Sequence, residues 1–177
     1  EPLAPGVLPG FSAPAAERVY VSPLLRCRQT AALLYPASVP ITAPGLRECD
    51  FGAFENKSYE QLKNDPAYRA WMDDRTGTLA PPGGEDAAAF RRRCCRAFSE
   101  IMEGCLADGV SSAAFVVHGG TIMAVMERFA ETDSPHGFYD WQPENFGGWT
   151  ARTTPELWRA RRALTDVRKL GEGPADV

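Results

Sequence analysis

The chain has 177 residues, of which 44% are hydrophobic and 24% charged, values typical of a globular protein that exclude a disordered or fibrous chain. Its 19 Lys and Arg residues against 23 Asp and Glu residues give a formal net charge of −4, which excludes a general attraction to nucleic acid or to an anionic membrane. No apolar run approaches the roughly 20 residues that span a bilayer, so we expect neither nucleic acid nor a membrane as a partner.

The first elements expected are a strand and a helix. Residues 1–17 hold four prolines and two glycines, which indicates an irregular segment. The β-branched and aromatic residues of Arg18–Ser22 predict a short buried strand. Apolar residues at helical spacing over Leu24–Leu34, closed by Pro36, predict a helix.

Short elements should follow. Val39–Thr42 can form a second strand, which Pro40 would confine to an edge or a strand start. Residues 43–57 have the composition of a loop. Residues 58–73 predict two short helices, with the second starting near Pro66.

A long helix dominates the middle of the chain. After the Pro-Pro-Gly-Gly break at 81–84, residues Glu85–Leu106 carry an apolar stripe at spacings of three and four: Phe90, Cys94, Ala97, Phe98, Ile101 and Cys105. Ala113–Val117 predicts a second buried strand, and Thr121–Ala130 a helix behind it.

The end of the chain predicts two edge strands, Trp149–Thr154 and Leu157–Ala163, and a mobile tail from Gly171. Because strands alternate with helices, we expect an α/β fold with a mostly parallel central sheet. The length fits one domain over residues 1–177.

The cysteines favour a reducing compartment. Their odd number, the adjacent pair and the absence of a Cys-x-x-Cys spacing argue against a disulfide framework or a zinc site. With no visible signal peptide, we expect the cytoplasm. The five are Cys27, Cys49, Cys94, Cys95 and Cys105.

The two predicted buried strands, Arg18–Ser22 and Ala113–Val117, each end in a polar turn followed by a helix. Ser22-Pro-Leu-Leu-Arg26 places a guanidinium in the first turn of one helix, and His118-Gly-Gly places an imidazole at the tip of the other strand. Ligands collect at the carboxyl ends of strands in open α/β sheets, and helix N-termini there offer N–H groups to anions. If the two strands are neighbours, Arg26 and His118 form a candidate phosphate site.

These residues alone leave other readings open. Arg26 can be a solvated helix charge, Glu48 a surface carboxylate and His118 a structural residue. Arg28 and the run Arg91, Arg92 and Arg93 favour a solvated helix face. His136 follows His118 without a preceding strand and is interpreted as a loop residue.

Four segments in a fixed order resemble the histidine phosphatase (phosphoglycerate mutase-like) superfamily over residues 18–154. They are VYVSPLLRCRQTAALL, LRECDFGAFENKSYEQL, PPGGE and FVVHGG. The sequence stretches FGAFENKSY and PPGGE are most similar to those of bacterial α-ribazole phosphatase-like members. The resemblance implies a three-layer fold in which helices flank the sheet.

The resemblance also implies roles for individual residues. Arg26 matches the arginine that grips the phosphate, and Gly119 would offer a backbone N–H to it. Glu48 matches the general acid/base, and His118 the second active-site histidine, which donates to the transferring phosphoryl group. Glu85 is interpreted first as a loop and helix-cap residue. No metal or cofactor is implied, and the substrate would be a small phosphorylated metabolite.

The family's nucleophile has no counterpart here. That histidine lies in an Arg-His-Gly segment at the tip of the first, central strand, whereas none of the 21 residues before Ser22 is a histidine. Because the chain begins at Glu1 and not at Met, we expect an N-terminal truncation and the loss of that strand. We therefore expect no phosphohistidine, weak phosphate binding, and poor stability or self-association from unpaired backbone and exposed apolar surface.

Three functions remain open at this stage. The leading one is metal-independent phosphomonoester hydrolysis through a phosphohistidine in the intact protein, with this chain inactive alone. A phosphoglycerate mutase would return the phosphoryl group to its substrate, and a longer basic loop after Glu48 would favour it, but residues 53–80 are not notably basic. A pseudo-phosphatase binding module is the third. The sequence predicts no oligomeric state.

Overall fold

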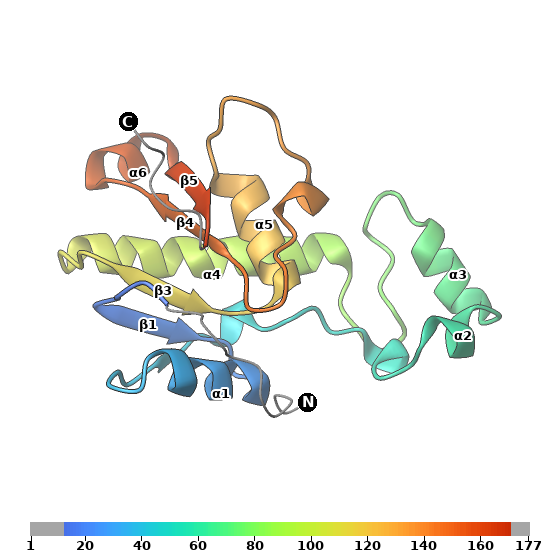
Figure 1. The fold of residues 1–177 in the computed structure, drawn as a ribbon. Helices are drawn as coiled ribbons and strands as arrows, with labels where there is room; N and C mark the ends of the chain where they lie inside the picture. Colours follow the sequence, from blue (N-terminus) through green and yellow to red (C-terminus); the bar gives the residue numbers. More distant parts are fainter. Residues whose placement is uncertain (1–12, 171–177) are drawn as a thin grey trace.

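A parallel sheet forms the centre of the molecule. The computed structural model describes residues 13–170 (Figure 1). Strand β1 (Arg18–Val21) lies between β2 (Ile41–Thr42) and β3 (Ala113–Val116), and both pairings are parallel. The three predicted strands are confirmed, and the strands that precede Ser22 and His118 are neighbours, as a shared site requires.

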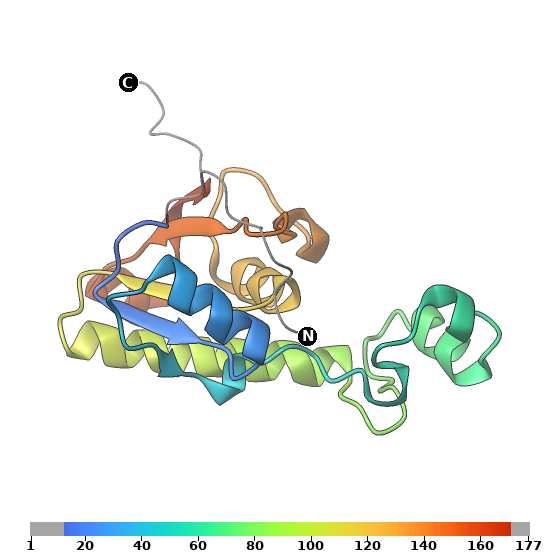
Figure 2. The same ribbon diagram turned by 60° about the horizontal axis from the view of Figure 1, so that its bottom comes forward.

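Helices cover both faces of this sheet, which confirms the predicted α/β arrangement (Figures 1 and 2). Side chains alternate along each strand. Val19, Val21 and Val116 pack with α1 (Leu25–Leu34) on one face. On the other face the ring of Phe115 lies 5.0 Å from that of Phe98 in α4.

Helix α4 (Ala87–Ala107) supplies the apolar stripe expected from the sequence, with Phe90, Cys94, Phe98 and Cys105 buried. It begins two residues later than predicted. The carboxylate of Asp86 accepts a hydrogen bond from the N–H of Ala89 at 2.6 Å, so Asp86 is the N-cap and the interpretation of Glu85 as a cap residue is wrong. Helix α5 (Gly119–Phe129) packs beside α4 and begins two residues before its predicted start.

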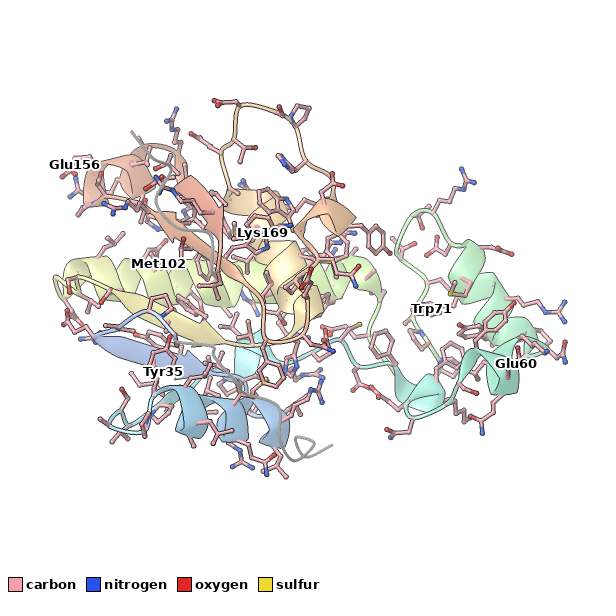
Figure 3. All side chains as sticks on the ribbon, in the orientation of Figure 1. Tyr35, Glu60, Trp71, Met102, Glu156 and Lys169 are labelled. Atoms are coloured by element: carbon pink, nitrogen blue, oxygen red, sulfur yellow. The ribbon has the colours of Figure 1, made fainter. Side chains whose placement is uncertain are left out.

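A small helical lobe projects from this body (Figures 1 and 2). Beyond η1 (Pro44–Leu46), it contains η2 (Gly52–Phe54), α2 (Tyr59–Leu62) and α3 (Pro66–Asp73), so the two predicted short helices are confirmed. Its core is aromatic, with the ring of Phe54 5.3 Å from Tyr68 and 5.7 Å from Trp71. In Figure 3, Glu60 and Trp71 lie on this lobe and Glu156 at the opposite end of the molecule.

The C-terminal part differs from the prediction at one element. Strand β4 (Trp149–Arg152) confirms the first expected edge strand, but the second is wrong, because residues 155–161 form helix α6 (Pro155–Arg161). Thr154 caps this helix by accepting from the N–H of Leu157 at 3.1 Å, and Pro155 is its first residue. The partner of β4 is β5 (Thr165–Lys169), and the two form a separate antiparallel pair. Between α5 and β4 the chain forms loops and the short helix η3 (Phe138–Trp141).

Within residues 13–170, β3 pairs along one side only, with β1. The irregular stretch predicted at the start of the chain and the mobile tail predicted from Gly171 fall mostly or wholly outside these residues, and the expected self-association stays a prediction. None of the helices in the described part combines the length and apolar character needed to cross a lipid bilayer.

Candidate functional site

The carboxyl ends of β1 and β3 bring the predicted residues to one edge of the sheet. The N–H of Ser22 donates to the carbonyl of Val116 at 3.1 Å, which extends the β1–β3 pairing by one residue. The turn into α1 and the turn into α5 therefore start side by side. This places Arg26 and His118 at one site, as the sequence predicted.

His118 joins β3 to α5 and is buried, with 5% of its surface exposed. It stands at the N-cap position of α5, but its ring makes no hydrogen bond to the helix. Its Nδ1 lies 4.0 Å from Oε2 of Glu48. Burial lowers the pKa of His118 to about 4, with a further contribution from the positive charge of Arg26, so the imidazole is neutral at physiological pH.

The carboxyl group of Glu48 is half-buried beside this imidazole. Burial raises the pKa of Glu48 above its ordinary value, although the N–H of Cys49, 3.0 Å from Oε1, and the charges of Arg26 and Arg93 oppose the rise. A carboxyl that keeps its proton to a higher pH is better suited to give that proton to a leaving group. The environment of Glu48 therefore has the property that a general acid needs.

Arg26 and the start of α5 supply positive potential to the same place. Arg26 is the second residue of α1, is half-buried, and its charge acts on both Glu48 and His118. Arg28 is exposed, as expected for a solvated charge. Gly119 is the first residue of α5, and the N–H groups of a first helical turn have no partner within the helix. Guanidinium, imidazole and helix N-terminus together favour an anion.

Arg93 departs from the sequence prediction. It was expected on a solvated helix face, but its side chain is only 18% exposed and its guanidinium is fully occupied. Two of its nitrogens donate to the carboxylate of Glu85 at 2.9 and 2.6 Å. It also donates to the carbonyls of Gly45, Arg47 and Glu48 at 2.9, 3.0 and 3.3 Å. Arg93 thus fixes the segment that carries Glu48 onto helix α4.

One feature of the sequence could have identified Arg93. It lies three residues after Phe90 and next to Cys94, so it borders the buried stripe of α4, whereas Arg92 points away and is exposed. The side chain of Arg91 is 41% exposed, which agrees with the expectation of a solvated charge, and it also has partners. It pairs with Glu127 at 3.1 Å and its guanidinium carbon lies 3.9 Å from the centre of the Phe138 ring.

Gly120 is required by the position of Glu48. A Cβ at residue 120 would lie 2.7 Å from Oε1 of Glu48 and 3.3 Å from the ring of Phe90. We expect Gly120→Ala to push the carboxylate out of its buried place and to lower the pKa of Glu48 toward its ordinary value, because burial is the main cause of the rise. A carbon-13 titration of the Glu48 carboxyl group measures this change.

Gly119→Ala is the matched control for that substitution. A Cβ at residue 119 would meet only Pro143, at 3.9 Å, an ordinary contact distance. The pKa of Glu48 should then stay at its wild-type value. An equal change in the two variants would show that the packing of Gly120 against the carboxylate has no special effect.

The remaining sequence candidates lie outside the site. His136 is an exposed loop residue that contacts the carbonyl of Ser134 at 2.8 Å, which agrees with its interpretation as a loop. All five cysteines are free thiols. Between residues 13 and 170, no group of three or more His, Cys, Asp or Glu side chains is arranged to hold a metal ion.

Comparisons with known proteins agree with this fold. The structure resembles an α-ribazole phosphatase from Shigella flexneri (TM-score 0.74, 20% identity, 92% of this chain and 78% of that one). It also resembles a mycobacterial glucosyl-3-phosphoglycerate phosphatase in complex with inorganic phosphate (TM-score 0.63, 21% identity, 87% and 75%). A third similar structure is a phosphoglycerate mutase from Bacillus anthracis (TM-score 0.54, 22% identity, 64% and 59%). At these identities the likeness establishes the fold.

No curated protein sequence is significantly similar to this chain. The family model of the histidine phosphatase superfamily (branch 1) does match, over residues 9–166. This span contains both strand ends, Glu48 and the α5 turn described above. The chain belongs to the histidine phosphatase superfamily.

Proposed function

We propose that this protein hydrolyses small phosphomonoesters through a phosphohistidine intermediate, without a metal ion. The nucleophilic histidine would come from an Arg-His-Gly segment, which these 177 residues do not contain. By themselves, the 177 residues are then not phosphorylated and do not turn over substrate. We also propose that they form one domain and act in the cytoplasm, which the five free thiols support.

One observation carries the proposal. A buried neutral imidazole and a half-buried carboxyl with a raised pKa lie 4.0 Å apart at the N-terminus of a helix, within the field of Arg26. Phosphoryl transfer depends mainly on positioning and on charge stabilisation, and this group of residues provides both around one anion. A family member that only bound another macromolecule would have no need for a carboxyl group whose pKa is raised beside an imidazole whose pKa is lowered.

Each residue then has a defined part in the reaction. Arg26 and the N–H of Gly119 bind the phosphoryl oxygens, and His118 donates a hydrogen bond to one of them. As the histidine nucleophile forms its bond to phosphorus and the ester P–O bond breaks, Glu48 gives its proton to the leaving oxygen. In the second half Glu48, now ionised, takes a proton from the water that breaks the P–N bond.

The test compares the 177-residue chain with a fusion that carries a strand ending in Arg-His-Gly at its N-terminus. The fusion should hydrolyse p-nitrophenyl phosphate in the presence of EDTA and form an acid-labile phosphoprotein, whereas the chain alone should do neither. Glu48→Gln should slow the fusion by about 10²-fold or more, since general acid catalysis is worth that much. Glu60→Gln, on the exposed outer lobe, is the control and should leave the rate unchanged.

Two outcomes would contradict the proposal. Stoichiometric labelling of the 177-residue chain by a phosphoryl donor would show a nucleophile of its own. A folded fusion that binds phosphate but neither hydrolyses the ester nor becomes labelled would favour the pseudo-phosphatase, a function that the missing Arg-His-Gly already allows.

A further inference from the structure

Ser22 contacts the imidazole of His118 through its hydroxyl group. Its Oγ lies 2.6 Å from Nε2 of His118, and both residues are buried, with 0% and 5% of their surfaces exposed. The hydrogen bond from the N–H of Ser22 to the carbonyl of Val116 fixes its backbone against the end of β3. The pairing of β1 with β3 therefore sets the position of the hydroxyl relative to the imidazole.

The neighbours of Ser22 favour a hydroxyl proton directed at His118. The backbone N–H of Leu24 can only donate, so Oγ is the acceptor in their 3.4 Å contact. The hydroxyl proton is then available to Nε2 of His118, a stronger acceptor than the thiol of Cys27. That sulfur lies 3.5 Å from Nε2 and 3.6 Å from Nδ1. Burial raises the pKa of Cys27 to about 11, so it adds no negative charge that would compete for the proton.

A neutral imidazole carries one proton, and a nitrogen that accepts a hydrogen bond cannot hold it. If Nε2 accepts from Ser22, the proton is on Nδ1. Nδ1 is the nitrogen on the side of Glu48, 4.0 Å from Oε2. The buried hydroxyl and the two nitrogens of His118 thus form a directed arrangement, in which the N–H of the ring is on the side of Glu48.

We propose that the Ser22 hydroxyl donates to Nε2 of His118 and holds the imidazole in the tautomer protonated on Nδ1, which makes Ser22 a positioning residue for His118. The Nδ1–H is then the group that His118 offers to a phosphoryl oxygen. This last step rests on the proposed function, whereas the tautomer is a property of the free chain and is measured without any substrate.

Nitrogen-15 spectroscopy of the imidazole rings tests the proposal directly. The chain has two histidines, so only His118 and His136 contribute ring signals. In the 177-residue protein at neutral pH, Nδ1 of His118 should give a protonated, pyrrole-type shift and Nε2 a bare, pyridine-type shift. In Ser22→Ala both shifts should move toward intermediate values as the second tautomer becomes populated, while Ser22→Thr, which keeps the hydroxyl, should preserve the wild-type pattern.

Ser99→Ala is the matched control. Ser99 is also buried, with 5% of its surface exposed, but its hydroxyl bonds to Glu103 and not to the site, so its removal should leave both shifts of His118 unchanged. A pyrrole-type Nε2 in the wild-type chain would overturn the proposal even if every variant failed to fold. Unchanged shifts in a folded Ser22→Ala would overturn it as well. An inactive fusion with the predicted tautomer would contradict only the proposed function.

Discussion

Replacing Arg93 with methionine is expected to lower the free energy of unfolding by about 3 kcal/mol, as measured by urea denaturation of the 177-residue chain. The substitution leaves the carboxylate of Glu85, whose side chain is 14% exposed, without its bidentate partner. It also removes the donors to the carbonyls of Gly45, Arg47 and Glu48. Removal of one member of a buried charged pair is costly because the other charge remains buried and uncompensated.

The adjacent residue provides the control. Arg92 belongs to the same helix turn but is exposed, so Arg92→Met should change the free energy of unfolding by no more than about 0.5 kcal/mol. In the double variant Arg93→Met with Glu85→Gln, part of the lost stability should return, since no ionised carboxylate is then buried alone. Equal losses of unfolding free energy for Arg92→Met and Arg93→Met would show that the hydrogen bonds of Arg93 do not stabilise the fold.

The second large effect is a pH dependence due to His118. Its pKa is about 4 in the folded chain and about 6.5 in an unfolded one, so the unfolded state binds the extra proton first. The stability contributed by His118 is therefore fully present above pH 6.5 and is lost as the pH falls toward 4. From the difference in pKa, wild type should lose about 3 kcal/mol more than His118→Gln over that interval.

Other groups near His118 make the comparison with the variant necessary. Glu48, with its raised pKa, acts with the opposite sign: its contribution is present at low pH and lost as the pH rises. The pKa of Cys27 is too high for its thiol to titrate in this range. His136→Gln, at an exposed loop residue, should reproduce the wild-type pH dependence. If His118→Gln kept the full pH dependence, the imidazole would not be held neutral by its surroundings.

The sequence predicted most of the body of the fold because local pattern and tertiary packing agree there. The strand at Arg18–Val21 and the stripe of α4 bury the side chains that their periodicity marks. The strand predicted over residues 157–163 is wrong, because Thr154 caps a helix there and Pro155 is the first residue of that helix. Strand β5 carries three charged residues among five, so no apolar alternation marked it.

The site could be predicted where chemistry depends on residue type, and not where it depends on a partner far along the chain. Arg26, Glu48 and His118 stand in motifs and come together as expected. Arg93 borders the apolar stripe in the sequence, but only the fold reveals that Glu85 and the carbonyl of Arg47 meet it. Ser22 was visible in its motif, but its link to Nε2 of His118 depends on the pairing of two strands distant in sequence.

The helical lobe leaves and rejoins the body at nearly the same point. The N–H of Glu85 donates to the carbonyl of Asp50 at 2.8 Å, and the N–H of Ala53 donates to the carbonyl of Pro82 at 2.9 Å. These two hydrogen bonds join the segment that enters the lobe to the segment that leaves it. Insertions or deletions within the lobe, between these two hydrogen bonds, need not move Glu48, which precedes the lobe in the chain, or Arg93, which follows it. The lobe can therefore change in length or sequence as a unit while Glu48 and Arg93 stay in place.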